Sequence, residues 1–77
     1  MKQKYSVILL TSSGDFLLED EEDIQREEYG VRAEKPYIIN EDEEAHRVKA
    51  KQIFVPYQSL ENIQYGEFEH ETVELQT

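Results

Sequence analysis

The sequence predicts a mainly β fold, either a small antiparallel barrel or a curled sheet, in one domain that spans residues 1–77. Three observations support this prediction. The apolar residues gather in short runs at 7–10, 16–18, 37–39 and 53–55, and bounded runs of this length are typical of strands. The runs contain the β-branched and aromatic residues that strands favour. The one segment that could form a long helix, residues 19–29, lacks a continuous apolar stripe, so we expect at most one or two short helical turns.

The first two strands are predicted to form a hairpin. Residues 3–10 read Gln-Lys-Tyr-Ser-Val-Ile-Leu-Leu, and Phe16-Leu17-Leu18 resumes the apolar pattern. Between them lies a turn sequence, residues 11–15, in which Gly14 can adopt a positive φ angle. Two strand runs joined by such a turn predict antiparallel pairing.

Residues 19–30 contain the acidic run, which we define as Glu19, Asp20, Glu21, Glu22, Asp23, Glu27 and Glu28. A helix that Gly30 caps is one alternative for this segment. However, Ile24 would be its only core-facing residue, and adjacent carboxylates would repel one another along the helix. We therefore expect residues 19–30 to form an exposed acidic loop that is inserted into the frame of the fold.

Strands are predicted to resume near Val31. Pro36 suits the start of a strand, residues 37–39 form a strand core, and residues 40–44 are a polar connection. The longest predicted strand runs from His46 to Tyr57. Its alternation places three cations on one face, and we call these the basic stripe: Arg47, Lys49 and Lys51.

The end of the chain is predicted to close the fold. Pro56 has no N–H group to donate, so the long strand should end there. Leu60 and Ile63 lie three residues apart, which suits one helical turn over the end of a barrel. Residues 62–68 predict a last strand with Gly66 at a β-bulge, and residues 69–77 predict an edge strand or a tail.

The segment Phe54-Val55-Pro56-Tyr57-Gln58-Ser59-Leu60-Glu61-Asn62-Ile63-Gln64-Tyr65-Gly66 resembles the closing segment of small SH3-like β-barrels. In the Sm-like and PRC-barrel families, a strand also ends in a tight turn, and an apolar pair three residues apart follows that turn. The resemblance implies an SH3-like barrel. The chain departs from Sm-like proteins because it has no amphipathic N-terminal helix and the acidic run interrupts its front half, so no RNA-binding residues are carried over.

The chain has a formal net charge of -10, to which a second acidic group at residues 41–44 contributes. This charge argues against general affinity for nucleic-acid backbones or anionic membranes, because both require cations. The apolar run at 7–10 is too short for a signal peptide or a membrane span. The chain has no cysteine, which excludes disulfides and thiolate metal sites and favours a cytoplasmic location.

No motif predicts catalysis, a cofactor or a specific metal site. The glycines are isolated, and no nucleophile, base and pocket combine as a catalytic site requires. Asn40, Asp42 and Glu44 alternate like calcium ligands, but the glycine and distal glutamate of an EF-hand loop are missing. His46 and His70 could bind zinc only if the fold brought them together. We therefore expect that the protein is not an enzyme.

These observations predict a non-catalytic binding module or assembly subunit of a bacterial or phage system, which mediates protein–protein interaction and could self-associate through strand edges. A first alternative is an inhibitor whose acidic run imitates nucleic acid and covers the basic surface of a target protein. The plainer interpretation of those acids is a solvated surface that keeps the protein soluble. A further alternative is an Sm-like RNA-binding protein that uses the basic stripe, although we expect those cations to pair with acids near Glu34 or Glu67.

Overall fold

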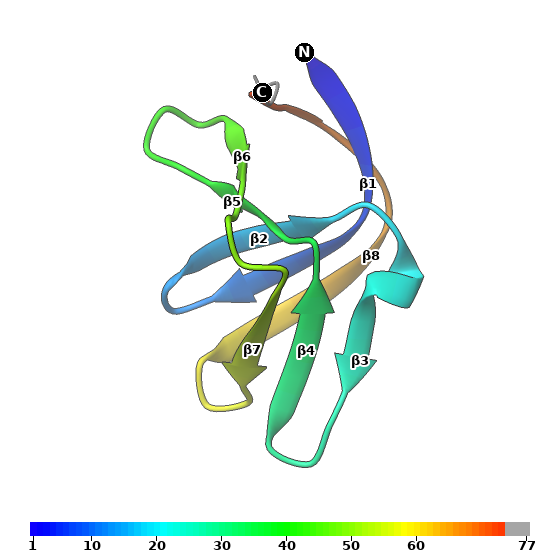
Figure 1. Cartoon of the computed structure of the whole chain (residues 1–77), viewed down its shortest axis with the longest axis vertical. Coiled ribbons are helices and arrows are strands. Elements are labelled where there is room, and N and C mark those ends of the chain that lie inside the picture. Colours follow the sequence, from blue (N-terminus) through cyan, green and yellow to red (C-terminus); the bar gives the residue numbers. More distant parts are fainter. Residues whose placement is uncertain (74–77) are drawn as a thin grey trace.

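Eight strands and one 3-10 turn form two antiparallel sheets in the computed structural model, which describes residues 1–73 (Figure 1). The elements are β1 (Lys2–Thr11), β2 (Gly14–Leu18), η1 (Glu21–Asp23), β3 (Ile24–Arg26), β4 (Gly30–Glu34), β5 (Tyr37–Ile39), β6 (Ala45–Arg47), β7 (Gln52–Pro56) and β8 (Leu60–Glu71). One sheet has the strand order β6-β5-β2-β1-β8 and the other β3-β4-β7. The predicted mainly β class is confirmed, but the sheets do not close into a barrel.

The predicted N-terminal hairpin is confirmed. β1 and β2 pair from Val7 opposite Leu18 to Thr11 opposite Gly14. Gly14 has a φ angle of 135°, a conformation that costs glycine little because it has no Cβ. The Thr11 hydroxyl donates to the Gly14 carbonyl at 2.7 Å, which fixes the turn.

The predicted bulge at Gly66 is confirmed, but the helical turn over Leu60 and Ile63 is wrong. β8 pairs with β1 over nearly its whole length, and its register shifts by one residue between the pairs Tyr5–Phe68 and Val7–Tyr65. The extra residue lies at Gly66 and Glu67, opposite Ser6. Leu60 and Ile63 belong to β8, and both pack against the core of the molecule. Of residues 69–77, the first three complete this edge strand, and residues 74–77 lie outside the described part of the chain.

Part of the segment 19–30 belongs to the second sheet, so the prediction of a loop is wrong for β3 and for Gly30, whereas eight of the twelve residues are exposed. After the single turn η1, Ile24 begins β3 and pairs with Ala33 of β4. Ile24 packs against the core, and pairing with β4 along all three residues also holds this short strand in place. Gly30 does not cap a helix but begins β4 opposite Pro56.

The predicted long strand from His46 to Tyr57 is also wrong, because the chain bends over residues 48–51. β6 pairs with β5 in one sheet, and β7 pairs with β4 in the other. Val48 N–H donates to the Pro36 carbonyl at 3.0 Å, and Lys35 N–H donates to the Lys51 carbonyl at 2.9 Å. These two bonds fasten the bend to the β4–β5 connection.

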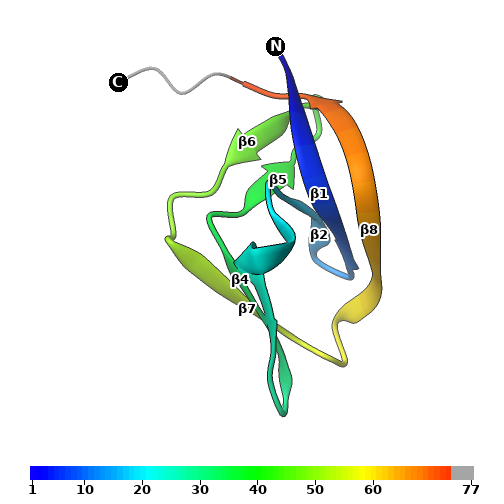
Figure 2. The same ribbon diagram turned by 90° about the vertical axis from the view of Figure 1, so that its right-hand side faces the viewer.

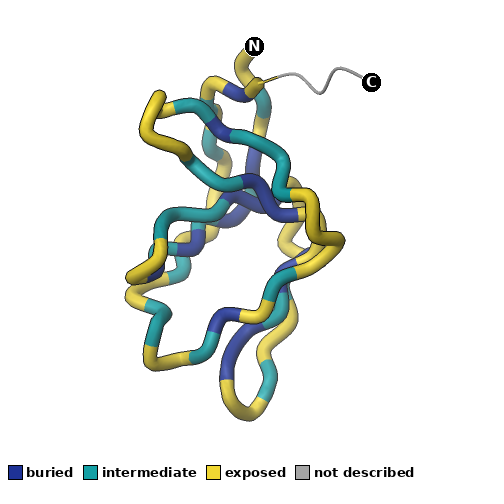
Figure 3. The backbone as a smooth tube through the Cα atoms, turned by 60° about the vertical axis from the view of Figure 1, so that its left-hand side comes forward, coloured by how far each residue is buried: buried dark blue, intermediate teal, exposed yellow. Residues whose placement is uncertain are grey.

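The interior consists of two apolar clusters, one toward each end of the molecule. The upper core lies toward β6 and the N-terminus in Figure 1 and comprises Tyr5, Leu17, Tyr37 and Ala45, with Ile8, Ile39 and Phe68 against it. The lower core lies between the two sheets and comprises Val7, Leu9, Leu18 and Ala33, with Phe16, Ile24, Ile53, Leu60 and Ile63 against it. In Figure 3, the buried residues lie mainly along the strands, whereas the tips of the hairpins are exposed.

The upper end is closed by residues 72–73, which we call the chain-end strap. As Figure 2 shows, the chain crosses from β8 toward β6 after Glu71. Thr72 N–H donates to the Met1 carbonyl at 2.8 Å, and Val73 N–H donates to the Ala45 carbonyl at 2.9 Å. The strap thereby bridges Ala45 and covers the edge of β6 at the start of that strand.

Candidate functional site

Four strands lie at the edges of the two sheets, and three of these edges are protected. The chain-end strap covers β6. β8 carries four exposed glutamates, and β3 has only three residues and ends in Arg26. Charged side chains and short length both hinder a strand edge from pairing with another chain. β7 differs because Gln52–Pro56 contains no charged residue.

The outer side of β7 presents unpaired backbone groups. Lys35 N–H donates to the Lys51 carbonyl in the same register that pairs β4 with β7. In an antiparallel ladder, every second residue directs its N–H and C=O groups at the neighbouring strand, so the odd-numbered residues face β4. The N–H and C=O groups of Gln52 and Phe54 therefore point away from β4. Within residues 1–73, no strand pairs with this side of β7.

An apolar hollow of about 230 Å³ lies beside this edge. It is lined by Thr11, Ser13, Phe16, Ile53, Phe54, Val55, Pro56 and Ser59. The hollow therefore separates β7 from the β1–β2 hairpin, and we call the free edge and this hollow together the β7 seam. Ser12 N–H donates to the Ser59 carbonyl at 2.9 Å, so a backbone contact joins the two sides of the seam at its lower end.

Exposed aromatic side chains surround the β4–β7 end of the molecule. The Phe54 side chain is 44% exposed and lies against Gly30, since a Cβ on that glycine would be 2.7 Å from the phenyl ring. The Arg32 guanidinium lies 5.9 Å from the centre of the same ring. The Tyr57 hydroxyl donates to the Glu27 carbonyl at 2.7 Å. Phenylalanine, tyrosine and arginine are enriched at protein interfaces, so the composition of this surface suits a protein partner.

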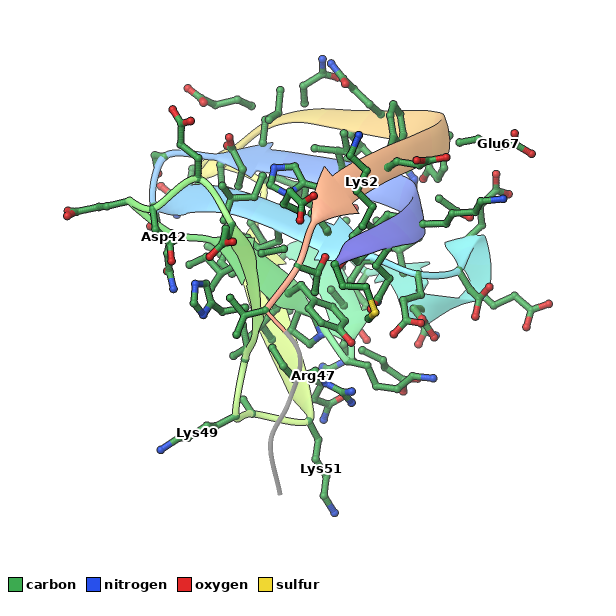
Figure 4. All side chains as sticks on the ribbon, turned by 90° about the horizontal axis from the view of Figure 1, so that it is seen from above. Lys2, Asp42, Arg47, Lys49, Lys51 and Glu67 are labelled. Carbon is green, nitrogen blue, oxygen red and sulfur yellow. The ribbon has the colours of Figure 1, made fainter. Side chains whose placement is uncertain are left out.

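The basic stripe does not exist as one face of a strand. Arg47 ends β6, whereas Lys49 and Lys51 lie in the bend before β7, from which they point in different directions (Figure 4). The expected pairing with acids near Glu34 or Glu67 is not found. Among the residues that the structure describes, none of the three cations lies within 4.0 Å of a carboxylate oxygen. Figure 4 shows Glu67 far from all three.

The acidic run is divided between structural and exposed residues. Asp23 is buried, with one carboxylate oxygen 3.7 Å from Lys35 Nζ and the other without a hydrogen-bond partner. Glu27 accepts two hydrogen bonds of 3.0 Å from the Arg32 guanidinium, and these bonds lower the pKa of the Glu27 carboxyl. The remaining acids of the run are exposed: Glu19, Asp20, Glu21, Glu22 and Glu28.

The second acidic group stabilises the β5–β6 hairpin. Asp42 accepts a hydrogen bond of 3.0 Å from the Glu44 N–H and shares one of 2.8 Å with the His46 ring. These two contacts lower the pKa of the Asp42 carboxyl, the backbone contact having the larger effect. The ligand atoms of Asp42, Glu44 and His46 lie within 4.8 Å of one another, and the bond between Asp42 and His46 accounts for the proximity of two of them.

Comparisons with known proteins identify no relative. The chain matches no protein-family model, no curated protein and no solved structure. In the part of the chain that the structure describes, no helix is long and apolar enough to cross a membrane.

The sequence contains one signal for the β7 seam, which is the lack of charge along β7. Charged residues make up 34% of the chain, yet the run from Gln52 to Tyr57 has none. An apolar, uncharged strand is ordinarily assigned to the centre of a sheet. Only the strand order reveals that β7 lies at an edge.

Proposed function

We propose that this protein is a non-catalytic interaction module that binds an extended segment of a partner protein along β7. The observation that supports this function is the free, uncharged edge of β7 beside an apolar hollow. A strand added there would bond the outward backbone groups of Gln52 and Phe54. One of its apolar side chains would enter the hollow. This combination of backbone pairing and side-chain pockets is how strand addition recognises peptides.

The chain itself contains a small example of the same arrangement. At the upper end, the chain-end strap lies along β6 and bonds Ala45 through the Val73 N–H. At the β7 seam, the equivalent position has no occupant among residues 1–73. The partner segment would pair with the free edge of β7, as the strap pairs with Ala45 of β6.

The partner we infer is a different protein and not a second copy. A net charge of -10 on 77 residues makes copies of this chain repel one another. The SH3-like relationship that residues 54–66 suggest also stays a prediction. β7 ends at Pro56 and a short turn leads into β8, as in such barrels, but here the β7 seam takes the place of barrel closure.

Nucleic-acid mimicry by the acidic run is the second candidate function. Five of its seven acids are exposed, and these five could face a basic surface. Asp23 and Glu27 instead contact cations of the protein itself, which makes the run a weaker match for an external target. The Sm-like RNA-binding hypothesis is weaker still, because the basic stripe is divided between a strand and a bend.

The test is selection of binding segments from a displayed library of random peptides, followed by measurement with two variants. Gln52→Pro removes an outward N–H group of β7 and leaves the bonds to β4 intact, since proline is tolerated on edge strands. We expect it to weaken the binding of selected peptides by about tenfold, because one backbone hydrogen bond is lost. Its thermal unfolding should match that of the wild type.

The control is the double variant Glu21→Gln, Glu22→Gln, which neutralises two exposed acids of the acidic run. It should bind the selected peptides as the wild type does. The amides of Gln52 and Phe54 should also exchange hydrogen more slowly in the complex. Failure to select any peptide would contradict the proposal. Binding that survives Gln52→Pro but is lost in the double variant would favour nucleic-acid mimicry instead.

A further inference from the structure

A second hollow, of about 410 Å³, lies at the start of β7. It is lined by Glu34, Lys35, Arg47, Lys51 and Gln52. Three of the eight cations in a chain of net charge -10 therefore face one hollow. Glu34 also lines the hollow, so its cations outnumber its carboxylates three to one, and a concave surface with a net positive charge attracts anions. We call it the cationic hollow.

The cations of this hollow are held in place by the fold. The Arg47 guanidinium lies 5.5 Å from the centre of the Tyr37 ring, and that tyrosine is only 6% exposed. The Lys35 N–H bonds to the Lys51 carbonyl, which ties the two lysine backbones together. Lys35 also has a φ angle of 49°, a left-handed conformation that non-glycine residues adopt rarely and that gathers at binding sites.

The charge of the hollow matches a small dianion better than a polyanion. A phosphate monoester carries a charge of about -1.5 to -2 at neutral pH and three acceptor oxygens. The Arg47 and Lys51 side chains can share these oxygens, while the Lys35 ammonium lies 3.7 Å from the Asp23 carboxylate. Arg47 can meet two of these oxygens through its guanidinium fork. A nucleic-acid strand would extend beyond the hollow and meet the repulsion of the many exposed acids.

We propose that the cationic hollow binds one phosphate monoester group, carried by the segment that β7 accepts. This inference rests on the proposed function, because Gln52 both lines the hollow and belongs to the free edge of β7. A strand that pairs with Gln52 and Phe54 would place one side chain at the cationic hollow and another at the apolar hollow. The two side chains would lie about two to four residues apart, since strands rise about 3.3 Å per residue. The partner is thus a protein that carries a phosphorylated serine or threonine near an apolar residue.

The first experiment titrates the free protein with inorganic phosphate and follows backbone amides by NMR. We expect saturable shifts at Lys35, Lys51 and Gln52. Lys51→Gln should weaken phosphate binding by about tenfold, because a charge-assisted bond is lost. Lys49→Gln changes the net charge equally but does not line the hollow, so it should shift the affinity less than about twofold. Equal effects of the two variants, or shifts that do not saturate, would overturn the inference.

The second experiment separates this inference from the proposed function. A peptide selected on β7 is synthesised with serine, phosphoserine or aspartate at the position beside Gln52. We expect phosphoserine to bind about tenfold more tightly than serine, and Lys51→Gln to abolish that gain. Equal binding of all three peptides would reject the phosphate site and leave the proposed function standing. Saturable binding of inorganic phosphate without any peptide binding would reject the proposed function and the peptide as the source of the phosphate group.

Discussion

The two ends of this molecule each have an edge strand, and they differ in whether another segment of the chain covers that edge. At the upper end, β6 is an edge strand that the chain-end strap covers, and the interior beneath it is sealed. At the lower end, β7 is an edge strand that faces an apolar hollow, with no strand of residues 1–73 on its outer side. Two residues of extended chain account for much of this difference.

This difference shows how few contacts decide whether a strand edge is available. The strap donates two backbone bonds, and its Thr72 carbonyl accepts a third from the N-terminal ammonium at 3.3 Å. Its buried side-chain contact joins the Tyr5 hydroxyl and the Thr72 hydroxyl at 2.7 Å. The edge of β8 is protected in another way, by exposed glutamates along its length. The acidic side chains therefore help to keep the strand edges of different molecules from pairing. Among the edge strands of the described residues, the uncharged β7 is the exception.

The largest expected effect concerns the contact that holds β4 against β7. A Cβ at Gly30 would be 2.3 Å from the Val55 carbonyl oxygen, so the two backbones would have to separate. We expect Gly30→Ala to lower the free energy of unfolding by about 2–4 kcal/mol, measured by urea denaturation. Gly66→Ala is the control near the upper core, because its Cβ would be 3.2 Å from the Phe68 ring, which can move. Similar losses of stability in both variants would mean that the close approach of β4 and β7 does not cause the loss in Gly30→Ala.

The second effect concerns the strap. The Thr72 hydroxyl donates to the His70 carbonyl at 3.0 Å, so the Tyr5 hydroxyl donates to Thr72. Tyr5 is 1% exposed, and burial raises the pKa of its hydroxyl. We expect Thr72→Val to cost about 1–3 kcal/mol, because it leaves this buried hydroxyl without a partner. Urea denaturation measures this loss in the free energy of unfolding.

The double variant Tyr5→Phe, Thr72→Val tests the cause of that loss. With both hydroxyls removed, neither is left buried without the other, so the total cost should be smaller than the sum of the single variants. Additive costs would show that the two hydroxyls do not act together. The strap would then be held by its backbone bonds alone.

The sequence predicted those parts of the fold that local chemistry determines. The turn at Gly14, the bulge at Gly66 and the end of β7 at Pro56 each depend on one residue with unusual backbone properties. The divided strand at residues 46–57 was missed because no proline or glycine marks the bend. That bend depends instead on distant bonds, such as the one from Val48 N–H to the Pro36 carbonyl.

The candidate site was missed for a related reason. Alternation shows which side chains face the interior, but not whether a strand lies at the centre or the edge of a sheet. The run Gln52–Pro56 has the composition of a central strand, and its edge position results from the strand order. The acidic run misled the prediction in the opposite direction, because Ile24 packs against the core and β3 pairs with β4 despite its acidic neighbours.

The smallest expected effect compares two carboxylates at the hairpin tips of the two ends. Glu27 at the β3–β4 hairpin has a lowered pKa because of its bonds to Arg32, and Asp42 at the β5–β6 hairpin has a lowered pKa because of the Glu44 N–H and His46. A carboxyl whose folded-state pKa is lowered adds stability above its unfolded-state pKa and loses it as the pH falls through the folded-state value. Protonation of all 18 acids also relieves repulsion in the folded state, which acts in the opposite direction. The difference in Tm between wild type and variant isolates the single contact.

We expect Glu27→Gln and Asp42→Asn to lower Tm slightly at neutral pH. This difference from the wild type should shrink as the pH falls below the unfolded-state pKa values of about 4, and it should vanish only below the lowered folded-state pKa values, where the wild-type carboxylates are protonated. Scanning calorimetry from pH 7 down to the acid range measures the Tm of the wild type and of each variant. The Asp42 difference should be the smaller one, because an asparagine oxygen can still accept the Glu44 N–H and only the charge is lost. A Tm difference that persists unchanged in acid would show that the carboxylate charge contributes nothing, and that the hairpin tips at both ends depend on shape alone.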